Sequence, residues 1–481
     1  MASDGARTLE AGPIAGVEAP LGARRQLAIT LLMGLVQLLI TSDFSSVSVA
    51  LPAIGAALQI DPAALSWVVS ATSITFVGLM IVGGRLTDLF GHRRALAWGL
   101  TAFALGSGLS ALAQNLWMLI ASRALLGAGA AVIAPASFAL ITAFLPAGRA
   151  QQRALGVFGW TQGLSVLAGL LLGGVLTSRI SWRAVFCINL PFALVALALA
   201  LAVLPRAGAS ARRGEPVDLG GGLAMMAGTA LLLSAVPALG AGGAAAWRGL
   251  ALLAGSAAAY GLFLRLEGGR SYALLPLSIF RTGDLTAASL ALMALIGAVG
   301  ALFVSASLFM QRKLGFSAEL SGLGMAPVAL ATMAAGQCAP LFMRRLPLRT
   351  IALGGQALQA VALLLLALAA PSGRYAATIA PFASLSVFGS ASAFMALMGL
   401  ATGQARPEQQ GTASALLFTA HQIGLPIGVA LALAAFRAAV PAAHAPLEAH
   451  QASFVVATIC AAAGFLLTLF LVRPSPRPLQ P

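Results

Sequence analysis

Three ionisable side chains stand inside long apolar stretches of this sequence. Asp43 lies in TSDFSSVSVALPAI, Arg123 in LIASRALLGAGAAVIAP and His421 in QQGTASALLFTAHQIGLPIGVAL. A charge at membrane depth costs roughly 3 kcal/mol or more, so it normally faces a cavity or an oppositely charged partner. A carboxylate that meets water from alternate sides can bind and release a proton, and an imidazole titrates in the physiological range. The chemistry these residues indicate is proton transfer.

Asp43 and Arg123 are expected to lie at the same depth. Asp43 is eight residues from the outer end of the apolar stretch 26–51, and Arg123 is seven from that of 116–141. At ~1.5 Å per residue, both lie roughly 10–12 Å below the surface. A neighbouring guanidinium favours the charged carboxylate, whereas exclusion of water favours the neutral form. The alternatives are a static ion pair and, for Asp43, a solvated position near the headgroups.

His421 stands ten residues into its apolar stretch, near the middle. It could shuttle protons, although a hydrogen bond to a neighbouring hydroxyl or carbonyl group is the simpler interpretation. The other histidines are scattered, and His444 and His450 are expected to be solvated in an outer loop. We therefore treat His421 as a secondary candidate for proton coupling.

The composition identifies the kind of chain that positions these residues. The 481 residues are 59% hydrophobic and only 9% charged, against about 25% charged in soluble domains. Apolar runs of ~20 residues cross a bilayer as helices, which predicts an all-α membrane protein. The chain is expected to cross fourteen times, over 26–51, 64–83, 95–113, 116–141, 152–177, 184–205, 219–239, 249–266, 285–310, 318–343, 348–370, 374–402, 411–437 and 451–472.

The basic residues predict the orientation of these spans. The net charge is +15, and most of the 28 basic residues fall on one side when the spans alternate from a cytoplasmic N-terminus. Such asymmetry marks the cytoplasmic side and favours an even number of spans, with both termini cytoplasmic. The arginines are spread over loops, so no nucleic-acid partner is expected. The first ~24 residues lack the apolar core of a signal peptide.

The chain divides into two similar blocks of six spans. The turn GGRLTDLFGHRRAL follows the second span of the first block, and PLFMRRLPLRTIALGG follows the second span of the other. Duplicated halves around a midplane site are typical of secondary transporters. We predict a cytoplasmic tail at 1–25, a six-helix bundle at 26–205, a linker at 206–218, an inserted helix pair at 219–270, a second six-helix bundle at 271–473 and a cytoplasmic tail at 474–481.

The turn from Gly84 to Leu96 carries a recognisable pattern. It reads G-x-L-x-D-x-x-G-x-R-R-x-L, and it resembles the signature loop between the second and third spans of the major facilitator superfamily. The resemblance implies that this loop is a conformational latch outside the substrate site. Its residues would be Gly84, Asp88, Gly91, Arg93 and Arg94.

Three further segments resemble the fourteen-span drug:proton antiporter branch of that superfamily. Asp43 stands nine residues before Pro52, as the branch's span-one acid does, and span thirteen is similar to Q-G-T-A-S-G-L-x-x-T-x-R-Q, with His421 in place of Arg. Span five resembles the antiporter signature G-P-x-x-G-G, with Leu170 where Pro is expected. Small residues let helices touch closely, and the helix-packing glycines here are Gly159, Gly163, Gly169, Gly173 and Gly174.

The resemblance implies a transporter of the inner or plasma membrane. We expect proton-coupled export of small lipophilic or cationic molecules by alternating access, with the chain working as a monomer in the lipid bilayer. A dedicated metabolite or antibiotic exporter, a proton symporter of this fold and a non-transporting scaffold are the alternatives. The sequence contains no phosphate-binding loop, no metal-spaced His/Cys set and no catalytic triad. We therefore expect no enzyme activity, cofactor, ATP site or metal.

Overall fold

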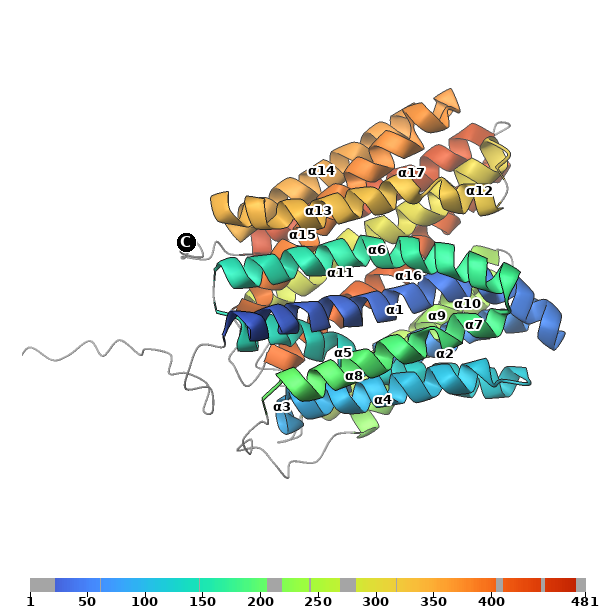
Figure 1. Ribbon diagram of the computed structural model, residues 1–481. Helices are drawn as coiled ribbons and strands as arrows, with labels where there is room; N and C mark the ends of the chain where they lie inside the picture. The colour runs from blue at the N-terminus through green and yellow to red at the C-terminus, as the bar shows by residue number, and fades with distance from the viewer. Residues whose placement is uncertain are drawn as a thin grey trace, which may run out of the picture.

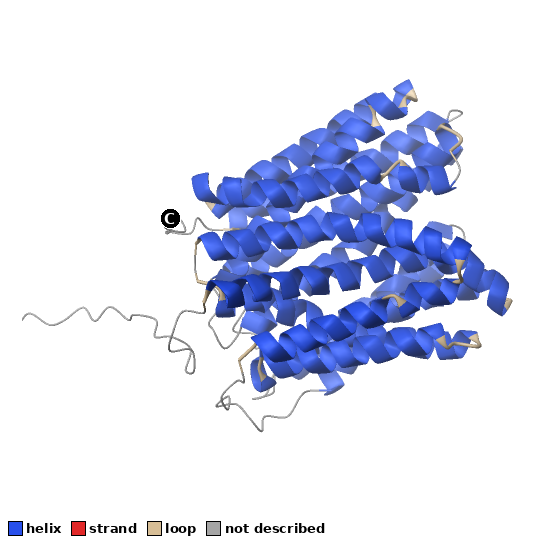
Figure 2. Cartoon of the chain, viewed as in Figure 1, coloured by secondary structure: helices blue, strands red, loops and turns tan. Residues whose placement is uncertain are grey.

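The computed structural model is built of helices. The residues described are 22–60, 62–146, 148–205, 219–241, 244–268, 283–316, 318–403, 410–442 and 446–472. Within these ranges there is no strand (Figure 2). Most of the predicted tail 1–25, the linker 206–218 and the tail 474–481 lie outside the described residues, and the predicted domain boundaries stay predictions.

The N-terminal half forms one group of packed helices, which occupies the lower part of Figure 1. Its helices are α1 (Ala23–Leu58), α2 (Pro62–Gly78), α3 (Met80–Phe90), α4 (His92–Ala111), α5 (Leu116–Phe144), α6 (Arg149–Arg179), α7 (Trp182–Cys187) and α8 (Asn189–Val203).

The C-terminal half repeats this arrangement in the upper and middle parts of Figure 1. It comprises α11 (Gly283–Leu308), η2 (Phe309–Lys313), α12 (Ala318–Leu323), α13 (Ala326–Arg345), α14 (Leu348–Ala369), η3 (Ala370–Ser372), η4 (Tyr375–Ala377), η5 (Ile379–Ala383), α15 (Ser384–Gly403), α16 (Gln410–Ala442) and α17 (Pro446–Leu471). Between the halves in sequence lie α9 (Leu219–Ala241) and α10 (Ala244–Gly268), which pack on each other, and α9 also contacts α2 and α16.

Each of the fourteen predicted spans overlaps in sequence with at least one helix of the structure. Eleven helices in the described part of the chain are long and apolar enough to cross a membrane, and the pair α2 and α3, bent by 46°, is a twelfth. The two predicted spans outside that set are α4 and α9. The chain is a multi-pass membrane protein, and the number fourteen stays a prediction.

Local sequence explains where several helices begin and end. Gly91 has φ 81°, which turns the chain between α3 and α4, and glycine reaches such backbone angles without a steric cost. The side chain of Asn115 accepts a hydrogen bond of 2.9 Å from the N–H of Met118 and caps α5. Pro191 has no N–H to donate to the carbonyl group of Cys187, and α7 gives way to α8 at this point.

The two turns of the sequence repeat make equivalent contacts. Arg93, in the first turn of α4, donates to the carbonyl oxygen of Leu201 at 2.9 and 3.2 Å, near the end of α8. Arg349, in the first turn of α14, donates to the carbonyl oxygens of Leu469 (2.7 Å) and Val472 (2.9 Å), at the end of α17. Carbonyl groups at a helix C-terminus lack intrahelical donors, so each arginine ties two helix ends together. This side of the bundle is called the Gly91 end below.

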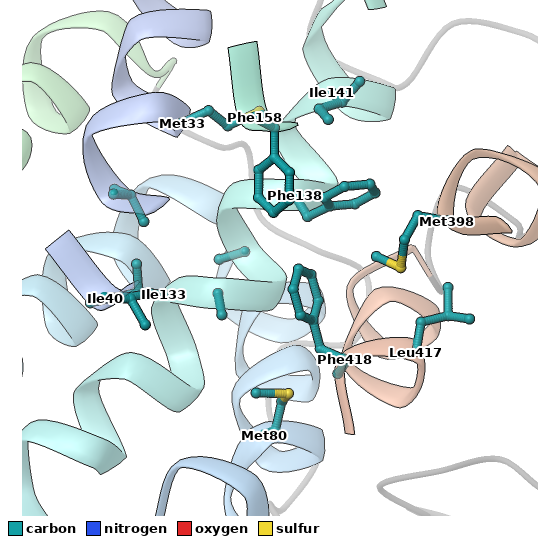
Figure 3. Packing of buried hydrophobic residues seen from close by; sticks show 14 of the residues in the cluster. Met33, Ile40, Met80, Ile133, Phe138, Ile141, Phe158, Met398, Leu417 and Phe418 are labelled. Atoms are coloured by element: carbon teal, nitrogen blue, oxygen red, sulfur yellow. The ribbon is translucent and has the colours of Figure 1, made fainter. Parts of the chain in front are cut away.

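The halves are joined near the Gly91 end. A methyl group added at Gly156 of α6 would lie 2.8 Å from Pro340 Cγ, and one at Gly159 would lie 3.0 Å from Gly336 Cα, both on α13. The hydroxyl group of Ser414 on α16 donates to the carbonyl oxygen of Pro135 on α5 at 3.3 Å. The main hydrophobic core crosses this junction (Figure 3). These contacts close the space between the halves at the Gly91 end.

Candidate functional site

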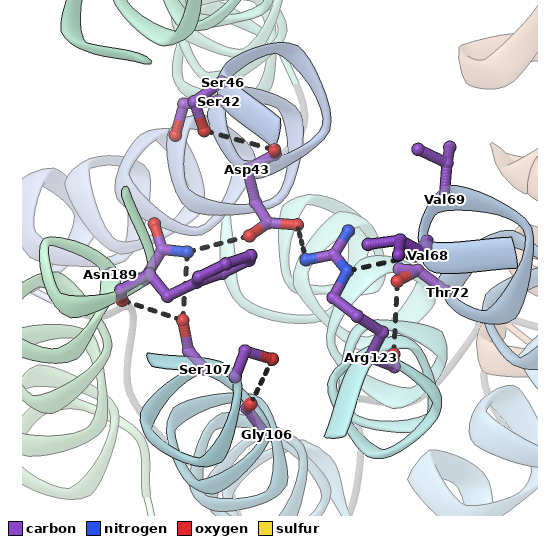
Figure 4. A network of polar contacts seen from close by, with 12 residues as sticks. Ser42, Asp43, Ser46, Val68, Val69, Thr72, Gly106, Ser107, Arg123 and Asn189 are labelled. Atoms are coloured by element: carbon purple, nitrogen blue, oxygen red, sulfur yellow. Dashed lines mark hydrogen bonds and ion pairs between the residues drawn. The ribbon is translucent and has the colours of Figure 1, made fainter. Parts of the chain in front are cut away.

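A buried ion pair joins two helices of the N-terminal half. Arg123 Nη1 on α5 lies 2.7 Å from Asp43 Oδ2 on α1, and both side chains have no exposed surface (Figure 4). The structure thus brings together the acid and the base that depth alone predicted to meet. A buried ion pair needs close geometry and further hydrogen bonds to offset the loss of hydration.

Side chains from two more helices complete these hydrogen bonds. Asn189 Nδ2, at the start of α8, donates to Asp43 Oδ1 at 2.8 Å and lies 3.1 Å from the hydroxyl oxygen of Ser107 on α4. The Ser107 hydroxyl group in turn donates to the carbonyl oxygen of Phe186 at 2.9 Å. The sequence analysis missed both residues. Asn189 could have been found, because it is the only amide side chain in the apolar run 184–205.

The guanidinium of Arg123 is only partly satisfied. Its Nε donates to the carbonyl oxygen of Val68 at 3.4 Å, and its Cζ lies 5.7 Å from the centre of the Phe186 ring. Its Nη2 is buried and has no hydrogen-bond partner among the described residues. A buried donor without an acceptor costs about 1–3 kcal/mol. The hydrogen-bonding groups of Arg123 are therefore less completely satisfied than those of Asp43.

Two of the predicted packing glycines bring α6 against α1 beside this pair. A methyl group at Gly169 would lie 2.6 Å from the carbonyl oxygen of Ser42, and one at Gly173 would lie 2.7 Å from Ser46 Cα. A methyl group added at Gly163 would instead lie 2.7 Å from the carbonyl oxygen of Ala329 on α13. Gly159 also contacts α13, at Gly336. Gly174 differs, since the nearest atom to an added methyl group is Val49 Cγ1 at 4.0 Å.

A large cavity of about 1340 Å³ lies between the two halves. Helices of both halves line it, and α9 of the inserted pair contributes Thr229, Leu232 and Leu233. Among the described residues that line the cavity, none is an Asp, Glu, Lys or Arg. Asp43 is not in the lining, although its neighbours Phe44 and Ser45 are. The ion pair is therefore sealed behind the wall that α1 presents to the cavity.

Four phenylalanines cluster at the floor of the cavity toward the Gly91 end, where Phe158, Phe394 and Phe418 line the cavity and Phe138 packs beneath Phe158 and Phe418. Phe138 and Phe158 come from the N-terminal half, and Phe394 and Phe418 from the C-terminal half. The ring centres lie 5.5 Å apart for Phe138 and Phe158 and 5.7 Å for Phe138 and Phe418 (Figure 3). Those of Phe158 and Phe394 lie 6.3 Å apart. Aromatic pairs at these separations attract one another. We call these four rings the aromatic floor.

His421 lies beside this floor. The structure places its ring 5.2 Å from Phe394 and 6.5 Å from Phe418, and its Nδ1 2.8 Å from Gln422 Oε1. It is half-buried and lines the cavity from α16. The ion pair is in the other half, on α1 and α5. The structure therefore brings Asp43 and Arg123 together and places His421 apart from them, at the cavity.

The family follows from comparison with known proteins. The family model described as Major Facilitator Superfamily matches residues 33–429. The chain belongs to the major facilitator superfamily. Two solved members show the same fold: the human organic anion transporter MFSD10, with a TM-score of 0.68 at 16% identity over 92% of this chain and 99% of that one, and the proton:xylose symporter XylE, with 0.63 at 15% over 94% and 97%.

Several curated proteins are similar along most of the sequence. The cephamycin export protein CmcT of Amycolatopsis lactamdurans is 33% identical over 91% of this chain and 89% of its own length. The puromycin resistance protein pur8 of Streptomyces alboniger is 32% identical over 82% and 78%. The methyl viologen resistance protein SmvA of Salmonella typhimurium is 30% identical over 85% and 82%.

The superfamily's signature loop lies at the Gly91 end. Gly84 is buried in α3, and Asp88 is half-buried in its last turn. Gly91 forms the turn, and Arg93 contacts the end of α8 as described above. Arg94 is exposed. These residues line neither the cavity nor the ion-pair site, so a role for them as a latch is a proposal about movement between helices.

One histidine lies in surroundings other than those predicted. His450 is fully buried, with its ring 5.0 Å from Phe436 and 5.6 Å from Phe309. The prediction that it is solvated is wrong, because α17 begins at Pro446 and carries His450 into a contact with two aromatic rings. His444 lies outside the described residues.

Proposed function

We propose that this transporter is a proton-coupled exporter of small lipophilic or cationic molecules, which works by alternating access in the cell membrane with both termini in the cytoplasm. The observation that carries the proposal is the buried Asp43–Arg123 ion pair directly behind the cavity wall. Its carboxylate is the group that would take up and release the proton, and no ATP site or other cofactor is required.

The proton step would act through α1. When Asp43 is charged, it holds α5 through Arg123 and α8 through Asn189. When Asp43 takes a proton, the attraction to the guanidinium is lost, and one carboxyl oxygen becomes a donor. Because Phe44 and Ser45 line the cavity from the same helix, a shift of α1 would change the cavity wall. This links protonation to the substrate site without direct contact between them.

The described state would be open to the outside. Ala53, Ser178 and Leu323 line the cavity near its far end, while the aromatic floor and the α6–α13 contact close the Gly91 end, which is predicted to be cytoplasmic. Rocking of the two halves about the cavity would open the Gly91 end. Asp88, Gly91, Arg93 and Arg94, with Gly84, would act as the latch for that movement.

The relatives support the direction of transport. The cephamycin export protein is similar over nine tenths of this chain, and two further relatives are named as resistance proteins, for puromycin and for methyl viologen. A dedicated antibiotic exporter is the second candidate function, favoured by the name of that first relative. The two candidates share one coupling mechanism and differ in the breadth of their substrates.

The coupling can be tested in proteoliposomes with an acidic lumen. Protons that leave through an antiporter would drive puromycin inward, at least tenfold above the outside concentration. Asp43→Asn should abolish this accumulation and keep exchange between labelled and unlabelled drug, because the proton-binding group alone is lost. Thr101→Val is the control, since the Thr101 side chain is exposed on α4 and bonds only the carbonyl oxygen of Ala97. Unchanged accumulation by Asp43→Asn refutes the role of Asp43, and accumulation only with an alkaline lumen indicates a symporter.

A further inference from the structure

The described lining of the cavity contains no carboxylate, ammonium or guanidinium group. Its described lining contains three amide side chains, Gln37, Gln162 and Gln422, one imidazole and a series of hydroxyl groups. Most of the remaining lining is aliphatic or aromatic. The acid nearest in sequence, Asp43, is behind the wall and already paired. The cavity therefore offers hydrogen bonds, and no carboxylate, to a molecule inside it.

The N-terminal half contributes one donor and one acceptor. Gln37 Nε2 donates to Thr41 Oγ1 at 2.8 Å and also to Gln162 Oε1. Both protons of that amide nitrogen are then in use. Gln37 Oε1 and Gln162 Nε2 have no hydrogen-bond partner among the described residues. This pair can accept one hydrogen bond from a ligand and donate others to it.

The C-terminal half contributes a second pair. An amide oxygen only accepts, so His421 Nδ1 donates in its 2.8 Å contact with Gln422 Oε1. In its neutral form the imidazole keeps the lone pair of Nε2 as an acceptor, and Gln422 Nε2 is a donor. Each half thus presents one donor and one acceptor to the cavity.

Both pairs adjoin the aromatic floor. Gln162 follows Phe158 by one helical turn on α6, and His421 lies 5.2 Å from Phe394. Most of the floor rings meet edge to face, including Phe138 with Phe158 and Phe138 with Phe418. These contacts cover ring faces that a cation would otherwise approach. The floor suits an apolar body, and the two pairs suit a polar neutral group on that body.

We propose that the cavity selects neutral amphiphiles, with an apolar or aromatic body and an amide or hydroxyl group, over organic cations, and that Gln37, Gln162, His421 and Gln422 determine this specificity. The inference rests on the proposed export function and narrows its substrates. A cation that enters a cavity without a carboxylate gives up hydration and gains no ionic partner. A neutral amide exchanges hydrogen bonds with water for hydrogen bonds with the protein at little net cost.

The test compares two probes in proteoliposomes with an acidic lumen and the membrane potential clamped at zero. Chloramphenicol is neutral and carries an amide and hydroxyl groups, and tetraphenylphosphonium is a permanent apolar cation. We expect chloramphenicol to accumulate at least tenfold more than tetraphenylphosphonium. Gln162→Leu and His421→Phe should each raise the KM for chloramphenicol about three- to tenfold, the loss of one hydrogen bond.

Two further variants make the test specific. Gln311→Leu is the matched control, because Gln311 is an exposed amide outside the cavity lining, and its KM should equal that of the wild type. Gln162→Glu keeps the shape of the side chain and its oxygen acceptor for Gln37 while adding a negative charge. It should raise the accumulation of tetraphenylphosphonium at least fivefold.

The outcomes distinguish failure of the inferred substrate specificity from failure of the proposed export function. If the wild type accumulates the cation as well as chloramphenicol, and Gln162→Leu, His421→Phe and Gln162→Glu change neither probe, the inference is overturned and the exporter stands. If the pH gradient moves neither of these probes nor puromycin, the proposed export function fails. A Gln162→Leu protein that does not fold leaves Gln162→Glu as the deciding variant.

Discussion

The two halves share a fold and differ in what they bury. The N-terminal half encloses the ion pair of Asp43 and Arg123. The C-terminal half encloses two neutral amides, Gln356 and Gln359 of α14, which have no exposed surface. When Arg93 is placed level with Arg349, these glutamines fall at the positions of Leu100 and Phe103 on α4. The repeat therefore keeps the helix-end contacts and changes the buried polar chemistry.

The two halves therefore differ in whether they bury an ion pair or only neutral amides. The described part of the C-terminal half contains no buried ion pair, so the proposed proton step at Asp43 belongs to the N-terminal half, and His421 stays a secondary candidate in the other half. Gln359 Nε2 donates to the carbonyl oxygen of Leu295 at 3.1 Å, whereas neither amide atom of Gln356 has a partner among the described residues. The cavity, by contrast, takes its polar groups from both halves.

The largest effect that separates the halves is expected from Arg123→Met. Methionine fills much of the side-chain volume and leaves Asp43 without its ionic partner, so the unfolding free energy should fall by about 3–5 kcal/mol. Gln359→Met, the matched change in the other half, should lower it by less than about 1 kcal/mol, because the change removes one neutral hydrogen bond of Nε2 and also the buried Oε1, which has no partner among the described residues. Unfolding in mixed detergent micelles measures both. Equal losses would mean that the ion pair adds nothing beyond a neutral contact.

A smaller effect of opposite sign is expected from Gln356→Met. The substitution removes two buried polar atoms that lack partners, so it should raise the unfolding free energy by about 1 kcal/mol. The same titration in mixed micelles measures it, with Gln359→Met as the comparison. A loss of stability would show that Gln356 has a partner in the membrane, such as a bound water, and would weaken the contrast between the halves.

The smallest effect concerns the two turns. Burial lowers the pKa of His92 from 6.5 to about 4, whereas Leu348 stands at the equivalent position of the second turn. Because folding depresses this pKa, the N-terminal turn loses stability as the pH falls from about 6.5 toward 4. His92→Leu should remove this loss. Protection of the 84–96 segment against hydrogen exchange at pH 7 and pH 5 measures this loss of stability. The segment around Leu348 should show no loss of protection between these pH values, either in the wild type or in His92→Leu.

The sequence predicted much of the fold and one part of the site. Apolar runs mark the helices because a segment that crosses lipid must satisfy its backbone hydrogen bonds within itself, as a helix does. The contact between Asp43 and Arg123 followed from their equal depth on two spans. Asn189 escaped notice because one amide carries little information about its neighbours. Its contact with Asp43 depends on how α8 packs against α1, and one sequence does not specify that packing.

The cavity was less predictable still. Gln37 and Gln162 are 125 residues apart and meet only because α1 packs against α6. Gln422 follows a histidine that the sequence did mark, yet its role depends on which side of α16 faces the cavity. The expectation for His450 failed for a similar reason, since the bounds of α17 decide whether that residue lies in a loop or among aromatic rings.

The position of α9 has a consequence for the role of the inserted helix pair. Thr229, Leu232 and Leu233 complete the cavity wall, and a methyl group at Gly78 of α2 would lie 2.6 Å from Met226 of α9. Excision of residues 219–268 would therefore remove part of the wall of the cavity. The inserted helix pair therefore shapes the cavity as well as packing against α2 and α16.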